Sequence, residues 1–320
     1  MSCELFQRLL EERTAEFNAL VELGDDALAG LHLALSVAPL RRIYSYAVPD
    51  DRVLGALAYH GCAGEGVLEI GAGTGLWASE LRSNGVPTLA YDLAPWTLKA
   101  SNAHNGYHSV NGQQAPAFTR VAQVDNLEAA VRDAGASAVL FLCWPPPEEK
   151  NAEATPEDVI YMAQRVLMSF GGRTVAYIGE MESDSSRTAG PRFHGALRSD
   201  WTCVDNIPLQ WRFPGCRDAL SIWTRNSKAE STWPSPSLLF TTNHGMASEE
   251  METAGAIRAR MVDATAASWQ AAAAQHIASR RLRGGPAARP GPEANAVSGF
   301  LRSAASGPWL RRTMTRLLCA

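Results

Sequence analysis

The stretch VLEIGAGTGLWASEL, residues 67–81, joins a short apolar run to an amphipathic segment through three glycines within five positions. Gly71, Gly73 and Gly75 carry no Cβ, so the backbone can turn sharply there and approach a ligand closely. The segment that begins at Leu76 is expected to be helical, and its unpaired N–H groups would then face such a ligand. The stretch therefore predicts a strand, a ligand-binding loop and a helix in succession.

The same alternation of strand-like and helix-like segments continues outward over residues 65–226. Strands are expected at 66–73, 87–95, 118–125, 137–147, 173–180, 202–209 and 218–225, and helices at 76–85, 96–106, 126–135, 156–172 and 191–200. Strands that are apolar almost throughout are typical of a parallel sheet covered on both faces. The pattern predicts an α/β fold with a Rossmann-like, doubly wound, seven-stranded sheet. Since no helix separates the last two strands, an antiparallel pair is expected at the C-terminal edge of this sheet.

Composition divides the chain into three zones. Residues 1–60 are predicted to form a helical N-terminal cap, 61–226 the ligand-binding α/β domain, and 227–320 an extension rich in Ala, Arg and Pro.

Within the extension, 231–239 has the composition of a linker, and 246–283 is predicted to be an Ala-rich helix. Its acids come early and its arginines late, as the helix dipole favours. The Gly, Pro and Ala content of 284–299 predicts disorder. The last segment, 309–318, is either a small basic amphipathic helix for a partner or membrane surface, or a frayed end.

The overall composition is that of a soluble globular protein. The 320 residues carry a formal net charge of −4, which gives no global argument for nucleic-acid binding. The six cysteines are scattered and form no C-x-x-C pair, so reduced thiols in an intracellular protein are expected. The N-terminus lacks the apolar core of a signal peptide, and no apolar run is long enough to span a membrane. A cytoplasmic location is therefore predicted.

The spacing of the glycines argues against a dinucleotide. A dinucleotide fingerprint requires G-x-G-x-x-G, but here Leu76 stands where the third glycine belongs, and Gly75 comes one place early. Glu69 precedes the first glycine by two residues. This E-x-G-x-G-x-G pattern resembles motif I of the class I S-adenosylmethionine-dependent methyltransferases. The resemblance implies that the loop wraps the methionine and ribose part of S-adenosylmethionine, with Glu69 orienting the amino group.

Two further acids follow predicted strands. Asp92 stands 21 residues after Gly71, where a carboxylate can accept hydrogen bonds from both ribose hydroxyls. Asp125 follows the third strand, where the methyltransferase family commonly places a polar contact to the adenine amino group. The alternative for Asp92 and Asp125 is that they are simple helix N-caps. The candidate cofactor-binding residues are Glu69, Gly71, Ala72, Gly73, Thr74, Gly75, Asp92, Leu93, Asp125 and Cys143.

Three prolines end the fourth strand, in the segment AVLFLCWPPP, residues 138–147. Since proline cannot donate to a sheet ladder, the strand must stop there, and the following carbonyls are expected to stay unpaired and available. The position resembles motif IV of the methyltransferases, except that Trp144 replaces the Asn or Asp of amino-group methyltransferases and Pro147 replaces an aromatic residue. Trp144 either stacks on a planar or cationic group or packs against the end of the sheet.

The resemblance covers roughly residues 40–226, and other strand ends supply the candidate catalytic groups. Glu180, after the fifth strand, is expected to bind substrate or act as a general base, because an apolar neighbourhood raises the pKa of a carboxyl group. Its alternative is capping or solvation. Catalytic roles are assigned to Glu180 and Trp144, and substrate contacts to Tyr46, Trp144, Pro145, His194 and Trp211. Phe193 and Asp218 are further candidates for the substrate wall, and Tyr44 and Tyr46 are expected to cover the cofactor.

No metal site is predicted. His104 and His108 have the i, i+4 spacing of a metal pair, but no recognisable third ligand accompanies them.

The sequence thus predicts an S-adenosylmethionine-dependent methyltransferase for a small molecule. Two alternatives stay open: methylation of a nucleic acid or protein, for which Arg280, Arg281 and Arg283 form a local basic cluster, and a methyltransferase-fold binding protein without turnover. The oligomeric state and the methyl acceptor are not determined by the sequence.

Overall fold

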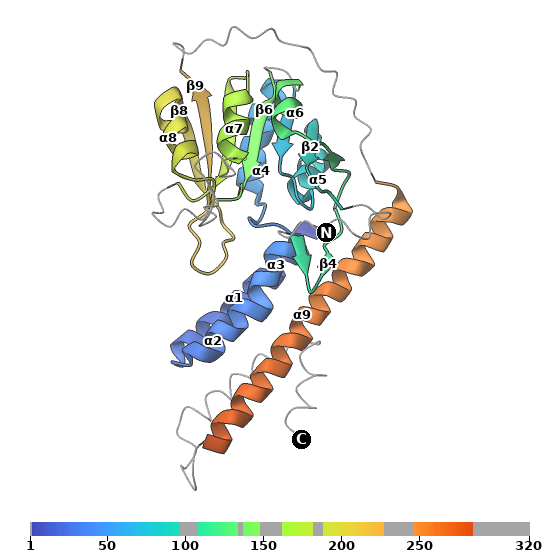
Figure 1. Cartoon of the computed structure of the whole chain (residues 1–320), viewed down its shortest axis with the longest axis vertical. Helices are drawn as coiled ribbons and strands as arrows, with labels where there is room; N and C mark the ends of the chain where they lie inside the picture. Colours follow the sequence, from blue (N-terminus) through green and yellow to red (C-terminus); the bar gives the residue numbers. More distant parts are fainter. Residues whose placement is uncertain are drawn as a thin grey trace, which may run out of the picture. The chain divides into compact units, whose positions relative to one another are not determined.

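The computed structural model describes residues 2–96, 108–133, 137–147, 162–181, 188–226 and 246–283. The chain separates into two compact units, one made of Met1–Glu11 with Leu40–Val262 and the other of Glu12–Pro39 with Asp263–Ala320. Helices α1 (Ser2–Glu22) and α9 (Ser248–Arg283) each contribute residues to both units (Figure 1). No helix in the described ranges is long and apolar enough to cross a membrane.

A seven-stranded sheet forms the centre of the first unit, in the order β5-β2-β1-β6-β7-β9-β8. All its neighbouring strands pair in parallel except β9, which runs antiparallel to both β7 and β8. The predicted α/β fold is therefore confirmed, with the antiparallel strand one place inside the edge. The strands are β1 Val67–Ile70, β2 Thr88–Asp92, β5 Ala122–Gln123, β6 Val139–Cys143, β7 Thr174–Gly179, β8 Trp201–Pro208 and β9 Ala219–Arg225.

Different helices cover the two faces of the sheet, because consecutive residues of a strand point to opposite sides. In β6, Val139 and Phe141 are buried with residues of α4 (Asp51–Ala63) and α5 (Leu76–Ser83). Leu140 and Leu142 are buried on the other face, with residues of the next three helices. These are α6 Leu127–Asp133, α7 Met162–Ser169 and α8 Pro191–Asp200. The sheet is thus doubly wound, as expected.

Some elements differ from the prediction. The strand expected at 118–125 is reduced to β5, which pairs only with the end of β2. A small hairpin of β3 (Ser109–Val110) and β4 (Gln113–Gln114) was not predicted, although Asn111-Gly112, both with positive φ, is a common hairpin signal. The helix expected at 96–106 and the start of the one at 156–172 fall almost wholly outside the described residues.

The N-terminal zone is helical, as predicted, and continues after α1 with α2 (Asp26–His32), the π-helical η1 (Leu33–Val37), α3 (Ala38–Ile43) and α4. The compact units assign residues 12–39 and 40–60 differently, and the three-zone division stays a prediction. The linker and tail expected at 231–239 and from 284 onward lie outside the described residues.

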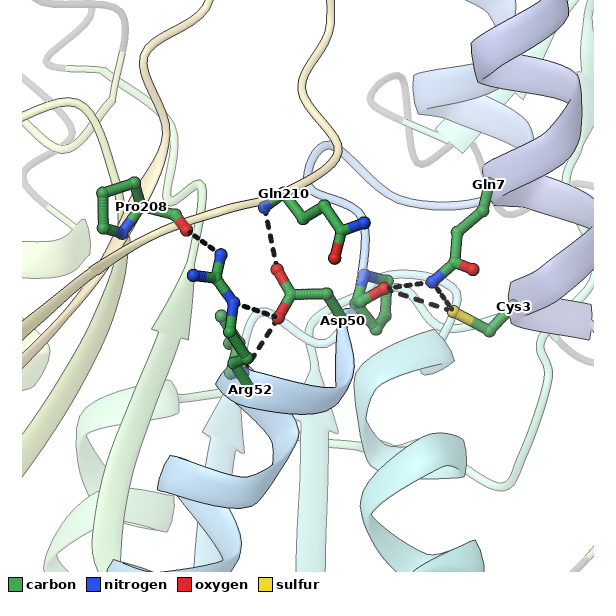
Figure 2. Close-up of polar contacts among 8 residues, drawn as sticks. Cys3, Gln7, Asp50, Arg52, Pro208 and Gln210 are labelled. Carbon is green, nitrogen blue, oxygen red and sulfur yellow. Dashed lines mark hydrogen bonds and ion pairs between the residues drawn. The ribbon is translucent and has the colours of Figure 1, made fainter.

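Within the first unit, the N-terminal part of α1 is hydrogen-bonded to the turn before α4. Gln7 donates a hydrogen bond of 2.7 Å to the carbonyl of Pro49, and the Cys3 thiol lies 3.5 Å from the same oxygen. Asp50 caps α4 through the N–H of Val53 and also accepts from the N–H of Gln210 at 2.9 Å (Figure 2). The turn thereby ties α1, α4 and the connection before β9 together.

The second unit is helical in its described part. Leu20, Leu28 and Ala29 are buried with Phe17 and Trp269. His32 is fully buried and bonds to Glu16 at 2.9 Å, and Arg13 donates to the carbonyl of Ser36 and to the hydroxyl of Thr265.

Candidate functional site

The direction in which successive strands are added to the sheet reverses between β1 and β6. From β1 the chain continues to β2 and β5 on one side, and from β6 it continues to β7, β8 and β9 on the other. Ligands of open α/β sheets bind at the carboxyl ends of the strands at such a switch point. The glycine loop follows β1, and Cys143 with Trp144 ends β6. The register pairs Glu69 with Phe141, so the two strand ends lie side by side.

The glycine loop uses a backbone that other residues rarely adopt. Gly71, Gly73 and Gly75 have φ values of +72°, +55° and +69°. The N–H groups of Gly71 and Ala72 donate to the carbonyl of Tyr91 at 2.9 and 3.1 Å, which holds the loop against the end of β2. Gly75 is the N-cap of α5, so the helix begins directly after the loop.

Asp92 holds the same loop from the end of β2. It is buried, and its carboxylate accepts from the N–H of Gly73 at 2.8 Å and from that of Ala94 at 3.1 Å. Leu93 is 51% exposed beside it, which leaves an apolar side chain at the carboxyl edge of the sheet. Asp92 thus fixes the path of the loop.

Glu69 is buried in β1 and leaves one acceptor atom open. Its side chain is 2% exposed, and its Oε2 has no hydrogen-bond partner in the described part of the chain. Burial raises the pKa of Glu69 to about 8, with Asp92 adding to the rise, while Arg82 and a hydrogen bond from the Ala78 backbone oppose it. A buried carboxylate with an open oxygen fits a cationic group of a ligand.

His108 covers the glycine loop, a role that its sequence spacing did not indicate. A Cβ on Gly73 would come within 2.2 Å of the His108 Nε2. Nδ1 of His108 lies 3.1 Å from the carbonyl of Arg42, and its ring meets Tyr46 edge-on at 5.7 Å. Burial lowers the pKa of His108, so the neutral ring is favoured. His104, its proposed partner in a metal pair, lies outside the described residues.

Trp144 adopts a left-handed conformation with φ +48° and connects several groups at the end of β6. Its Nε1 donates to Oδ1 of Asp218 at 2.9 Å. The guanidinium of Arg41 lies 5.6 Å from its ring centroid, and the Tyr46 ring lies 5.9 Å away. Trp144 thus packs at the end of the sheet beside Arg41, a cation of the chain itself, and its stacking on a bound group stays a prediction.

Glu180, Cys216 and Asp218 form a buried cluster beside Trp144, with one ligand atom of each within 4.8 Å of the others. Oε1 of Glu180 accepts from the N–H of Arg217 at 2.8 Å, and Arg41 donates to the Cys216 sulfur at 3.1 Å. The spacing suits a metal ion, but Arg41 already supplies positive charge there. We therefore assign no metal to the cluster.

Asp218 is the member of this cluster best arranged for proton transfer. It is 1% exposed, Oδ1 is held by Trp144, and Oδ2 has no partner among the described residues. Burial raises the pKa of Asp218 to about 7; Glu180 adds to the rise, whereas Trp144 and Arg41 oppose it. The sequence placed Asp218 only in the substrate wall.

Cys143 is the last residue of β6. Burial raises the pKa of its thiol well above the ordinary value, and both Glu69 and Asp218 add to the rise.

One expectation for the proline segment was wrong. The carbonyl of Pro145 is not left unpaired, because it accepts from the N–H of Ala189 at 2.9 Å. The chain after α7 and β7 thus returns to the end of β6 and satisfies this oxygen.

The remaining candidates lie at varied depths. Asp125 is exposed, and the N-cap of α6 is Asn126, whose side chain accepts from the N–H of Ala129 at 3.0 Å. His194 is buried in α8 beside the Tyr177 hydroxyl, 3.1 Å from its Nε2, and burial lowers the pKa of His194 to about 4. Trp211 is half-buried in the connection between β8 and β9. Thr74 is buried and donates to the carbonyl of Tyr44.

No model of a protein family matches the chain, and no curated protein matches it. Among solved structures, the chain is similar to magnesium protoporphyrin IX methyltransferase (ChlM) from Synechocystis PCC 6803 with bound SAM, at 13% identity and a TM-score of 0.34, over 67% of this chain and 97% of ChlM. It is also similar to the antibiotic-resistance methyltransferase Kmr, at 13% identity and a TM-score of 0.28, over 54% of this chain and 93% of Kmr.

A third similar structure is WbdD in a co-crystal with a kinase inhibitor, at 13% identity and a TM-score of 0.33. The match covers 55% of this chain and 41% of the WbdD chain, so this chain spans less than half of that protein's length. Identities and TM-scores this low carry no argument about activity. By its own sheet order and glycine loop, the first unit is a Rossmann-like α/β domain with one antiparallel strand.

Proposed function

We propose that the chain is an S-adenosylmethionine-dependent methyltransferase that acts on a small molecule. The observation that carries this proposal is the buried Glu69 carboxyl group, whose Oε2 is open at the switch point beside a loop of positive-φ glycines. An ammonium group is the ligand feature that such an oxygen suits. The resemblance of E-x-G-x-G-x-G to motif I gives the same role to Glu69.

Two features argue against a nicotinamide dinucleotide. Leu76 replaces the third glycine of the dinucleotide fingerprint. The sheet has the dinucleotide-fold order with an antiparallel strand, β9, inserted between β7 and β8. Both departures are consistent with a different nucleoside-containing cofactor.

Each proposed cofactor-binding residue is assigned to one part of S-adenosylmethionine. Glu69 would bind the amino group, Asp92 the ribose hydroxyls, and Asp125 the adenine amino group, with Leu93 against the base. The backbone of Gly71–Gly75, including Ala72 and Thr74, would lie along the methionine part, near Cys143. Asp92 already accepts from the N–H of Gly73, and the lone pairs that remain can accept ligand hydroxyls.

S-adenosylmethionine, when bound, supplies an electrophilic methyl group on a sulfonium. The chain's own task is then to align the acceptor with that carbon and to receive a proton if the acceptor carries one. Glu180 and Asp218 are the candidates for the proton, and Trp144 positions Asp218. Tyr46, Pro145, His194 and Trp211 remain proposed substrate contacts.

Calorimetric titration of the full chain with S-adenosylmethionine, S-adenosylhomocysteine and the nicotinamide cofactors tests this proposal. We expect the first two to bind, and binding to be lost in Asp92→Ala and Gly73→Val. Gly85→Ala serves as a matched control, since Gly85 also has positive φ (+76°) but a Cβ there meets nothing within 4 Å. Binding of a nicotinamide cofactor alone would overturn the proposal, as would unchanged affinity in both site variants.

A further inference from the structure

A buried arginine of the C-terminal helix α9 reaches the segment that supports the glycine loop. Arg258 belongs to the first unit and is 8% exposed. Its Nη2 donates to the carbonyl of Pro116 at 2.8 Å and lies 3.3 Å from that of Ala117. Its guanidinium lies 3.5 Å from the centroid of the Phe118 ring. One side chain therefore fixes three consecutive residues of this segment.

The same segment is bonded directly to the glycine loop. The N–H of Phe118 donates to the carbonyl of Thr74 at 2.8 Å, and the Thr74 hydroxyl donates to the carbonyl of Tyr44. The Phe118 and Tyr44 rings lie 5.8 Å apart. Thr74 is thus held from two sides, by the backbone of Phe118 and by that of Tyr44. Phe118 therefore links Arg258 directly to the loop, through its ring on one side and its N–H on the other.

Close packing continues at the next loop position. A Cβ on Gly75 would come within 2.7 Å of Cγ2 of Val121 and 3.3 Å of Cγ2 of Thr119. A displacement of residues 116–121 would therefore change the space around both Thr74 and Gly75. On this side the loop packs against residues 118–121, which continue the segment that Arg258 contacts.

A buried guanidinium is costly unless its charge is compensated. Here two carbonyl oxygens compensate Nη2 and an aromatic face covers the guanidinium, whereas Nε has no hydrogen-bond partner among the described residues. Burial lowers the pKa of Arg258 to about 10. A hydrophobic residue could fill such a volume without the cost of desolvation. The same Nη2 contacts both carbonyls while the planar guanidinium lies over the Phe118 ring, a combination that the compact ammonium of lysine does not offer.

We propose that Arg258 is a positioning residue for the cofactor site: through residues 116–118 it holds Thr74 and Gly75 in the conformation that binds S-adenosylmethionine. The inference rests on the proposed function for its binding readout. By this proposal the N-terminal part of α9 supports the cofactor site, although it follows the last strand of the α/β domain.

The test uses the full chain and three variants: Arg258→Ala, Arg258→Lys and, as a matched control, Arg260→Ala. Arg260 lies two positions along the same helix and is exposed. We expect calorimetry with S-adenosylhomocysteine to give a Kd about tenfold weaker for Arg258→Ala, an intermediate Kd for Arg258→Lys, and a Kd within about twofold of wild type for Arg260→Ala.

Amide hydrogen exchange without ligand supplies a second readout, which separates positioning from a general loss of stability. In Arg258→Ala we expect faster exchange at residues 71–75 and at the N–H of Phe118, with protection in β6 retained. Arg258→Lys, which keeps the charge, covers the case in which the alanine variant fails to fold.

The two possible failures are distinguishable. If wild type binds no S-adenosylhomocysteine, the proposed function fails, and exchange at 71–75 then decides the inference alone. If wild type binds and both Arg258 variants match it in Kd and in loop exchange, the inference is overturned and the proposed function stands.

Discussion

Glu69 has a buried carboxyl group whose ionisation must accompany the binding of a cation. Because burial raises its pKa to about 8, the free protein holds it mostly protonated at neutral pH. A ligand ammonium favours the ionised form, so binding below that pKa must displace the proton. Affinity for S-adenosylhomocysteine is therefore expected to rise with pH from about 6 to about 8, by up to about tenfold per pH unit, and to level off above.

Titrations across this pH range measure the effect, and Glu69→Gln is the control. The amide cannot ionise, so its weaker binding should vary little over the same range. The charged groups that act on Glu69 are Arg82, which lowers its pKa, and Asp92, which raises it. Equal pH profiles for wild type and Glu69→Gln would show that Glu69 does not meet the cofactor's amino group.

At the level of single residues, the sequence identified candidates by their place relative to the glycine loop, and their roles in binding stay predictions. Glu69 and Asp92 could be found because both stand at fixed distances from a glycine loop. Arg41 could not, since its contacts with Trp144 and Cys216 join residues far apart in the chain. The wrong expectation for the Pro145 carbonyl has the same origin, because its partner, Ala189, comes from a distant segment.

At the scale of elements, the turn into α5 depends on glycine for two separate reasons. Gly75 has φ +69°, and a Cβ there would meet Val121 at 2.7 Å. Gly85, just after the same helix, has φ +76° with open space around it. Gly85→Ala should therefore cost only the backbone strain, about 1 kcal/mol, whereas Gly75→Ala should cost at least about 1 kcal/mol more.

Urea unfolding of the two variants measures this difference, and titration with S-adenosylhomocysteine should show weaker binding in Gly75→Ala alone. Equal losses of stability would mean that residues 119–121 move aside freely, which would also weaken the case for a fixed wall behind the loop.

The elements themselves were predictable to different degrees. The strands β1, β6 and β7 carry nearly continuous buried apolar runs, so their period and length were clear from the sequence. The strand expected at 118–125 is mostly irregular, because Phe118 bonds to Thr74 and so supports the loop, and only Ala122 and Gln123 pair with β2.

For the whole molecule, composition changes did not coincide with the compact units. The Ala-rich helix predicted at 246–283 exists as α9, yet its residues up to Val262 belong to the unit that contains the sheet. Periodicity along one helix does not indicate which partners its two halves have. Arg258 is an example, since its partners Pro116, Ala117 and Phe118 all lie in the unit that contains the sheet.

The second unit has its own hydrophobic cluster, so we expect its stability to be independent of cofactor binding by the first unit. Trp269 packs edge-on against His32 at 4.6 Å and joins the cluster of Leu20, Leu28 and Ala29. Trp269→Ala should destabilise this unit by about 3 kcal/mol, near the lower end for such truncations because the side chain is half-buried. Affinity for S-adenosylhomocysteine should stay within about twofold of wild type, since no glycine-loop contact is removed.

Circular dichroism during urea unfolding and calorimetry on the full chain measure the two effects, with the exposed Ser268→Ala as control. A loss of affinity as large as that expected for Arg258→Ala would mean that the second unit's core also supports the cofactor site.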